Sequence, residues 1–139
     1  MKRDPEIRSE KGLLVVLSGP SGVGKGTVVA HAMSTRNGGG RRLRRSISVT
    51  TRPRRADERD GVDYFFCGPD DFERKVRAGE MLEHAVYLDH RYGTPAAWVD
   101  EQRAAGYDVV LEIEVLGAMQ VKQRRPQAVL IYMLPPSWR

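Results

Sequence analysis

A glycine-rich segment that ends in a lysine carries the clearest chemistry in this sequence. The segment follows the apolar run 13–17, and its residues are Gly19, Pro20, Ser21, Gly22, Val23, Gly24, Lys25, Gly26 and Thr27. A buried strand that leads into such a turn and a helix start brings several backbone N–H groups and the positive end of a helix dipole to one anion. Lys25 adds a full positive charge. The segment therefore predicts a loop that binds the phosphate chain of a nucleotide.

One position departs from the usual pattern of phosphate loops. Ser or Thr normally follows the lysine and binds magnesium through its hydroxyl. Here Gly26 stands in that place and Thr27 comes one residue later. Either Thr27 takes over part of the role, or the metal is held mainly by waters and phosphate oxygens, which suits an ion that loses its waters reluctantly.

Arginines cluster in the quarter of the chain that follows this loop. They are Arg41, Arg42, Arg44, Arg45, Arg52, Arg54, Arg55 and Arg59. Because guanidinium groups attract phosphates, the cluster is consistent with a second phosphate site near the first. The first four are more simply charges of a solvated turn after the glycine run 38–40. The formal net charge of +5 does not by itself require nucleic acid, since neither interpretation needs it.

Length and composition limit the class of protein. With 139 residues, the chain is long enough for about one domain with its own core. No apolar run approaches the roughly 18 residues that span a bilayer, so we expect no membrane segment. Residues 1–11 are charged and lack the apolar stretch of a secretory signal, which predicts a cytoplasmic protein. A single Cys67 and three histidines predict neither a disulfide nor a metal cluster, and Cys67 is interpreted as a small apolar packing residue.

The hydrophobic pattern predicts an α/β fold. Buried strands are expected at 13–17, 107–115 and 128–134, shorter strands at 46–50, 63–66 and 83–88, a break at 92–95, and helices at 27–33, 72–78, 96–105 and 116–123. Long strands separated by helices describe a parallel sheet flanked by helices, into which a smaller mixed α+β unit is inserted. We expect a core at 1–46, the insertion at 47–92 and the continued core at 93–139. The phosphate loop, Glu112 and Glu114 fall at the carboxyl ends of the strands, where such sheets bind ligands.

Four blocks of residues, in order, resemble the guanylate kinase family over residues 12–137. The blocks are 19–25, then 46–52 with 61–66, then Glu83 with 92–94, and last 111–114 with Gly117, Ala118 and 134–137. The resemblance implies a P-loop kinase fold with a separate domain for the nucleoside monophosphate. It also implies transfer of the γ-phosphoryl group of ATP to GMP, with Mg²⁺, giving ADP and GDP.

The resemblance also implies roles for individual residues. Arg52, Arg55, Tyr64 and Tyr92 would bind the GMP phosphate, and Ser48, Glu83, Gly93 and Thr94 would surround the base. The Glu83 carboxylate can accept hydrogen bonds from N1–H and the exocyclic amine of guanine, a donor pair that adenine lacks. Lys25 would act with Arg52 and Arg55 in catalysis. Glu112 would contact GMP and would order magnesium and its waters, with Thr27 as a second candidate for the metal.

Several residues have simpler interpretations. Arg54 and Arg59 are interpreted as solvated loop charges, and Tyr87 and Trp98 as packing aromatics rather than base stackers. Glu114 either binds nucleotide or caps local structure. Family members commonly have Asp where Glu112 or Glu114 stands and Gln where Leu116 stands, which leaves the acid geometry around the metal open.

The family continues beyond residues 137–139 into an arginine-bearing lid, so we expect a truncated enzyme with an exposed sheet edge. An impaired fragment, or a non-catalytic guanylate-kinase-like binding module, is the alternative function. The nearly intact phosphate loop favours the enzyme over the module. A nucleic-acid-binding P-loop protein is a third alternative, but no aromatic-interleaved basic motif supports it. The sequence does not predict the oligomeric state.

Overall fold

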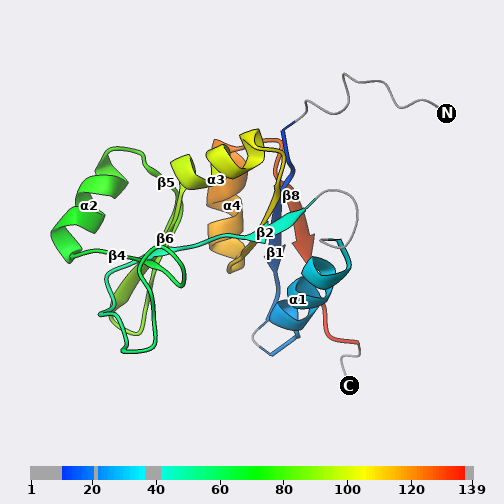
Figure 1. The fold of residues 1–139 in the computed structure, drawn as a ribbon, viewed down its shortest axis with the longest axis horizontal. Coiled ribbons are helices and arrows are strands. Elements are labelled where there is room, and N and C mark those ends of the chain that lie inside the picture. The colour runs from blue at the N-terminus through cyan, green and yellow to red at the C-terminus, as the bar shows by residue number, and fades with distance from the viewer. Residues whose placement is uncertain (1–10, 21, 37–41, 137–139) are drawn as a thin grey trace.

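The fold contains two four-stranded sheets, and the first of them is parallel (Figure 1). The computed structural model describes residues 11–20, 22–36 and 42–136. The strand order is β2-β7-β1-β8, with β1 (Leu14–Ser18), β2 (Leu43–Arg45), β7 (Asp108–Glu112) and β8 (Val129–Tyr132). β1 lies in the middle, with Leu14 opposite Val109 of β7 and Val15 opposite Val129 of β8. The predicted parallel sheet is confirmed.

The strands of a second, mixed sheet lie between β2 and β7 in the sequence. Its order is β4-β3-β6-β5, with β3 (Val49–Thr50), β4 (Phe65–Phe66), β5 (Met81–Tyr87) and β6 (His90–Pro95). β3 runs parallel to β4 and antiparallel to β6, and β5 and β6 form a hairpin. Helix α2 (Pro69–Arg77) covers this sheet through Phe72, which packs on Val49 and Met81. Cys67 packs against the same cluster, as predicted for a small apolar residue.

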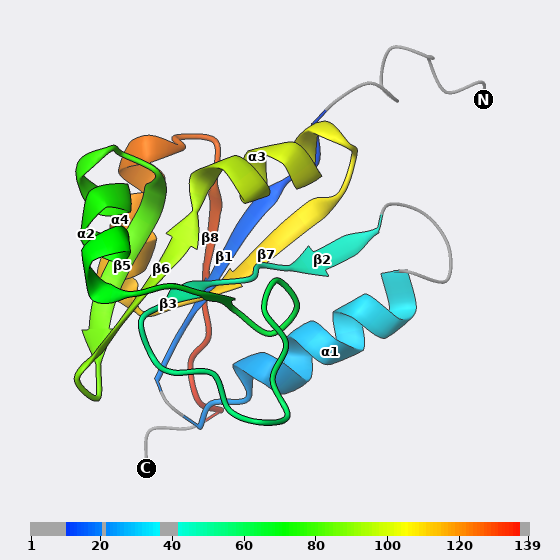
Figure 2. The same ribbon diagram turned by 60° about the vertical axis from the view of Figure 1, so that its left-hand side comes forward.

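Helices cover both faces of the first sheet (Figure 2). α1 (Lys25–Arg36) lies on one face, where Val29 packs with Leu17, Leu43 and Val110. α3 (Ala96–Ala104) and α4 (Val115–Arg124) lie on the other face. Successive strand residues point to opposite faces, so Leu17 faces α1, while Leu14 and Val16 pack in the apolar cluster on the face that α3 and α4 cover.

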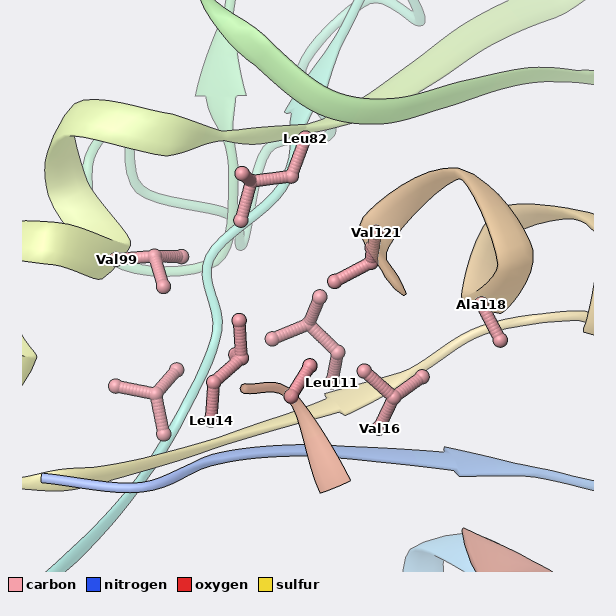
Figure 3. Packing of buried hydrophobic residues seen from close by; sticks show 9 residues of the cluster. Leu14, Val16, Leu82, Val99, Leu111, Ala118 and Val121 are labelled. Carbon is pink, nitrogen blue, oxygen red and sulfur yellow. The ribbon is translucent and has the colours of Figure 1, made fainter. Parts of the chain in front are cut away.

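Leu82 of β5 joins the two sheets into one packed body. Its side chain is fully buried in the cluster between the first sheet and helices α3 and α4. Figure 3 shows it facing the side chains that rise from β1 and β7 and those of Val99 and Val121 from the two helices. The second sheet is thus anchored to the first through an apolar contact.

Three sequence predictions are wrong in detail. Residues 92–95 do not break a strand but belong to β6, because a tight turn at Leu88 and Asp89, both with positive φ, folds the chain back. Of the strand predicted at 46–50 only Val49–Thr50 is strand, β3, because 46–48 connects it to β2 of the other sheet, which includes Arg44 and Arg45 of the predicted solvated turn. The strand predicted as buried at 128–134 is exposed, because β8 is an edge strand whose four residues are 42–52% exposed; the expected exposed sheet edge is confirmed.

Leu82→Ala should lower the free energy of unfolding by about 2–5 kcal/mol, because it removes buried methyl groups from the contact between the sheets. Urea denaturation followed by circular dichroism measures the change. Leu88→Ala, at a side chain 74% exposed, is the control and should stay within about 0.5 kcal/mol of the parent. Equal effects of the two substitutions would mean that Leu82 does not anchor the second sheet.

Candidate functional site

The phosphate loop joins the end of β1 to the start of α1. Gly22 and Gly24 have φ values of 77° and 98°, a region that residues with a Cβ rarely adopt. Lys25 is the first residue of α1, and its Nζ donates a hydrogen bond to the Gly19 carbonyl at 2.6 Å. The lysine is thereby folded back over the loop at a helix N-terminus, the arrangement that favours anion binding. Ser21 lies outside the described residues.

Glu112, at the carboxyl end of β7, lies beside this loop. A Cβ on Gly26 would be 3.7 Å from Glu112 Oε2. The other carboxylate oxygen of Glu112 pairs with Arg45 Nε at 2.9 Å. Thr27 is exposed in the first turn of α1. The loop thus has one acid next to the position at which other phosphate loops carry a hydroxyl.

This donor set fits a magnesium ion bound together with a nucleotide. Among the described residues, no cluster of three or more His, Cys, Asp or Glu side chains could hold a metal ion. Mg²⁺ commonly keeps several waters and takes one or two carboxylates plus phosphate oxygens. Glu112 supplies such a carboxylate at the edge of the loop, and the residues present therefore fit the metal only in company with phosphates.

A cavity of about 490 Å³ lies between the second sheet and α4. It brings together three residues predicted for the acceptor site, Ser48, Glu83 and Tyr92. Glu114 and Leu116 also line it. Glu112 lies beside the phosphate loop and Glu114 lines the cavity, so the segment that follows β7 leads from the loop to the cavity.

Glu83 is a buried carboxylate at the inner wall of this cavity. It is 6% exposed, and its Oε1 accepts a hydrogen bond of 2.8 Å from the hydroxyl of Thr94, which is 1% exposed. Burial raises the pKa of the Glu83 carboxyl, and the Thr94 hydrogen bond opposes part of that shift. Gly93, beside Thr94, is a packing position, because a Cβ there would lie 3.0 Å from the Glu83 carbonyl oxygen.

The arginine-rich loop is organised by an acid that the sequence analysis missed. Both oxygens of Glu58 accept hydrogen bonds from the Arg52 guanidinium, at 2.9 and 2.7 Å, and Oε1 also accepts one from the Arg55 N–H at 2.8 Å. Arg52 lowers the pKa of Glu58 to about 2, and Glu58 in turn raises the pKa of Arg52. The available signal was an acid three residues after Arg55 in a basic loop.

Aromatic rings continue from Arg52 toward the cavity. The Arg52 guanidinium lies 5.2 Å from the centre of the Tyr64 ring, and Tyr64 packs edge-on against Tyr92 at 6.1 Å. Tyr92 in turn contacts Tyr87 edge-on at 6.3 Å. Three of the residues predicted for the acceptor phosphate, Arg52, Tyr64 and Tyr92, therefore form one continuous surface together with Glu58. Arg55 is exposed at its edge.

Some residues that the sequence analysis assigned to packing, solvent or capping have those roles, and others line the cavity instead. Trp98 packs against the apolar cluster of the first sheet, as predicted, and Arg54 is exposed. Tyr87 is not a core aromatic, because its side chain is 61% exposed and lines the cavity. Glu114 occupies the N-cap position of α4 without a side-chain capping hydrogen bond and lines the cavity, which favours a ligand over a capping role.

Comparison with known proteins agrees with this geometry. The protein-family model described as Guanylate kinase matches residues 11–139. The chain belongs to the guanylate kinase family. Curated guanylate kinases of Streptococcus mutans and Streptococcus pyogenes serotype M3 are 52% and 51% identical over 129 residues, and each match covers 93% of this chain. The crystal structure of guanylate kinase from Anaplasma phagocytophilum aligns with a TM-score of 0.67 at 32% identity, over 93% of this chain and 63% of that one.

The chain spans about 60% of the length of the curated guanylate kinases it matches. Over the residues that match, the predicted α/β fold of this family is confirmed. None of the helices in the described part of the chain is long and apolar enough to cross a membrane.

Glu83→Gln should stabilise the protein at neutral pH. A carboxyl whose pKa is raised by folding ionises first in the unfolded chain, so the free energy of unfolding falls as pH rises from its usual pKa of 4.5 through the folded value. The amide of glutamine carries no charge, so the variant does not lose stability in this way. The urea midpoint of Glu83→Gln should therefore exceed that of the parent by more at about pH 7 than at about pH 4.

Glu80→Gln, which removes an exposed carboxylate, is the matched control. It should show a much smaller difference between the two pH values. A Glu83→Gln midpoint that lies below that of the parent at neutral pH would contradict the cost of burying this charge.

Proposed function

We propose that the protein transfers the γ-phosphoryl group of ATP to GMP and so acts in guanine nucleotide metabolism. The observation that carries the proposal is the Glu83 carboxylate, which is buried, accepts a hydrogen bond from the Thr94 hydroxyl and lines a cavity near a phosphate loop. A buried carboxylate is costly unless its ligand supplies donors. Guanine supplies two on one edge.

Base recognition would rest on Glu83, with hydroxyl groups beside it. Its carboxylate would accept hydrogen bonds from N1–H and the exocyclic amine of guanine. Ser48 and Thr94 would meet the remaining polar atoms of the base. With AMP the carboxylate would stay buried without those donors, and a site built to hydrogen-bond its substrate rejects an analogue that lacks the groups.

The acceptor phosphate would bind to the surface formed by Arg52, Arg55, Tyr64 and Tyr92. A planar guanidinium binds phosphate oxygens through paired N–H donors. Glu58 holds Arg52 in place before the ligand arrives, which lowers the loss of side-chain freedom on binding. In this account Glu58 is a positioning residue.

In the transfer step, an oxygen of the GMP phosphate attacks the γ-phosphorus of ATP, and the bond to the bridging oxygen breaks as ADP leaves. Lys25 and the loop N–H groups would bind the ATP phosphates and stabilise the charge that develops, while Arg52 and Arg55 would hold the attacking group in line. Glu112, with Thr27, would hold the waters of Mg²⁺, which neutralises phosphate charge when bound. Glu112 would also contact GMP.

In this proposal GMP and ATP bind to different parts of the chain. Residues 47–92 would form the GMP-binding domain, and 1–46 and 93–139 the core that binds ATP. Both partners are nucleotides, and the proposed reaction involves neither nucleic acid nor a membrane. A cytoplasmic location would match the supply of ATP and GMP.

A coupled assay of ADP release tests the proposal, with ATP, Mg²⁺ and either GMP or AMP. The protein should turn over with GMP and not with AMP. Glu83→Gln should raise KM for GMP by roughly 10- to 100-fold, because hydrogen bonds to a charged group contribute about 1.5–3 kcal/mol.

Glu80→Gln is the control and should leave KM for GMP unchanged. Equal turnover with AMP and GMP, or an unchanged KM in Glu83→Gln, would contradict the proposed base recognition.

A further inference from the structure

Gly117 of α4 lies directly against the Glu83 carboxylate. A Cβ on Gly117 would be 3.1 Å from Glu83 Oε2 and 3.3 Å from Ile113 Cδ1, closer than most carbon contacts. Gly117 is buried, and it is helical, so its backbone does not call for glycine. Glycine weakens a helix relative to alanine. The structural reason for glycine here is therefore space.

The carboxylate has little room to move away from α4. Its other oxygen is held by the Thr94 hydroxyl at 2.8 Å, and Glu83 and Thr94 are paired across β5 and β6. The next residue in β5, His84, donates its backbone N–H to Gln120 Oε1 of α4 at 3.2 Å. This hydrogen bond fixes the spacing between the strand and the helix. Glu83 is thus confined between Thr94 on one side and the Gly117 backbone on the other.

We infer that Gly117 is a specificity-determining position, because the missing side chain sets where the Glu83 carboxylate stands. The inference rests on the proposed function, in which this carboxylate reads the guanine edge. A helix of the ATP-binding core would then position the base-reading group of the GMP-binding domain. Gly117 itself need not touch the base.

Small displacements matter at such a site. Binding groups must be held within about 0.5 Å of their productive geometry, and a methyl group on Gly117 would push the carboxylate by a few tenths of an ångström. Gly117→Ala should therefore weaken GMP binding by about tenfold, since misplacement of about 1 Å can cost on the order of 100-fold. The urea midpoint should not fall, because alanine favours the helix.

Isothermal titration calorimetry with GMP on the 139-residue chain measures the effect. Gly68→Ala is the matched control, because Gly68 has an ordinary φ of −77° and a Cβ there would meet no atom within 4 Å. It should bind GMP like the parent.

Two double variants show which contact transmits the effect. Glu83→Asp shortens the side chain and makes room for a methyl group on Gly117. The loss of GMP affinity in the Gly117→Ala/Glu83→Asp double variant should therefore be smaller than the sum of the losses in the two single variants. Ile113→Val removes the other close atom and should not restore binding to Gly117→Ala. The urea midpoint of each variant separates a loss of GMP binding from a loss of folded protein.

The outcomes separate this inference from the proposed function. A parent chain that binds no GMP would overturn both. A parent that binds GMP, with Gly117→Ala unchanged or restored by Ile113→Val, would overturn the inference alone. A tenfold loss that is partly recovered with Glu83→Asp supports it.

Discussion

The burial of one carboxylate between the second sheet and α4 is the constraint on which the site depends. Glu83 is 6% exposed, and its hydrogen-bond partner Thr94 is a neutral hydroxyl. Taking a charged group out of water is costly unless hydrogen bonds replace the lost hydration. The apolar cluster around Leu82, the residue directly before Glu83 in β5, stabilises the fold and offsets this cost. Packing that stabilises the molecule thus holds the carboxylate ready for a ligand with matching donors.

The end of β7 connects this carboxylate with the phosphate loop. Glu112 faces the loop beside Gly26, and two residues later Glu114 lines the cavity that contains Glu83. α4 begins at the next residue and carries Gly117 against Glu83. One strand end and one helix start therefore contribute to both the phosphate loop and the cavity. The proposed transfer needs a phosphoryl donor and an acceptor that meet, and a loop and a cavity at one shared edge are consistent with that need.

Local pattern was sufficient to predict much of the fold. Alternation and apolar runs predicted β1, β7 and the helices, because those elements bury continuous faces. The pattern failed at 92–95, where Gly93 and Pro95 indicated a break, because hairpin pairing with β5 overrides local preference. The pattern also failed at β8, because an apolar run does not show whether a further strand or helix covers it. The role of Gly117 was out of reach for the same reason, because a tertiary contact defines it. Glu58 had only a local signal, an acid three residues after Arg55 in a basic loop, and its hydrogen bonds to Arg52 depend on how that loop folds.

Affinity for a graded series of nucleotides tests the central claim most directly. GMP offers the Glu83 carboxylate two donors, inosine monophosphate keeps N1–H but lacks the exocyclic amine, and AMP offers neither in the same place. Calorimetric titration of this chain at neutral pH should therefore give the tightest binding for GMP, weaker binding for inosine monophosphate and the weakest for AMP. AMP binding as tight as that of GMP would contradict the account, because the buried carboxylate would then contribute nothing to the choice of acceptor.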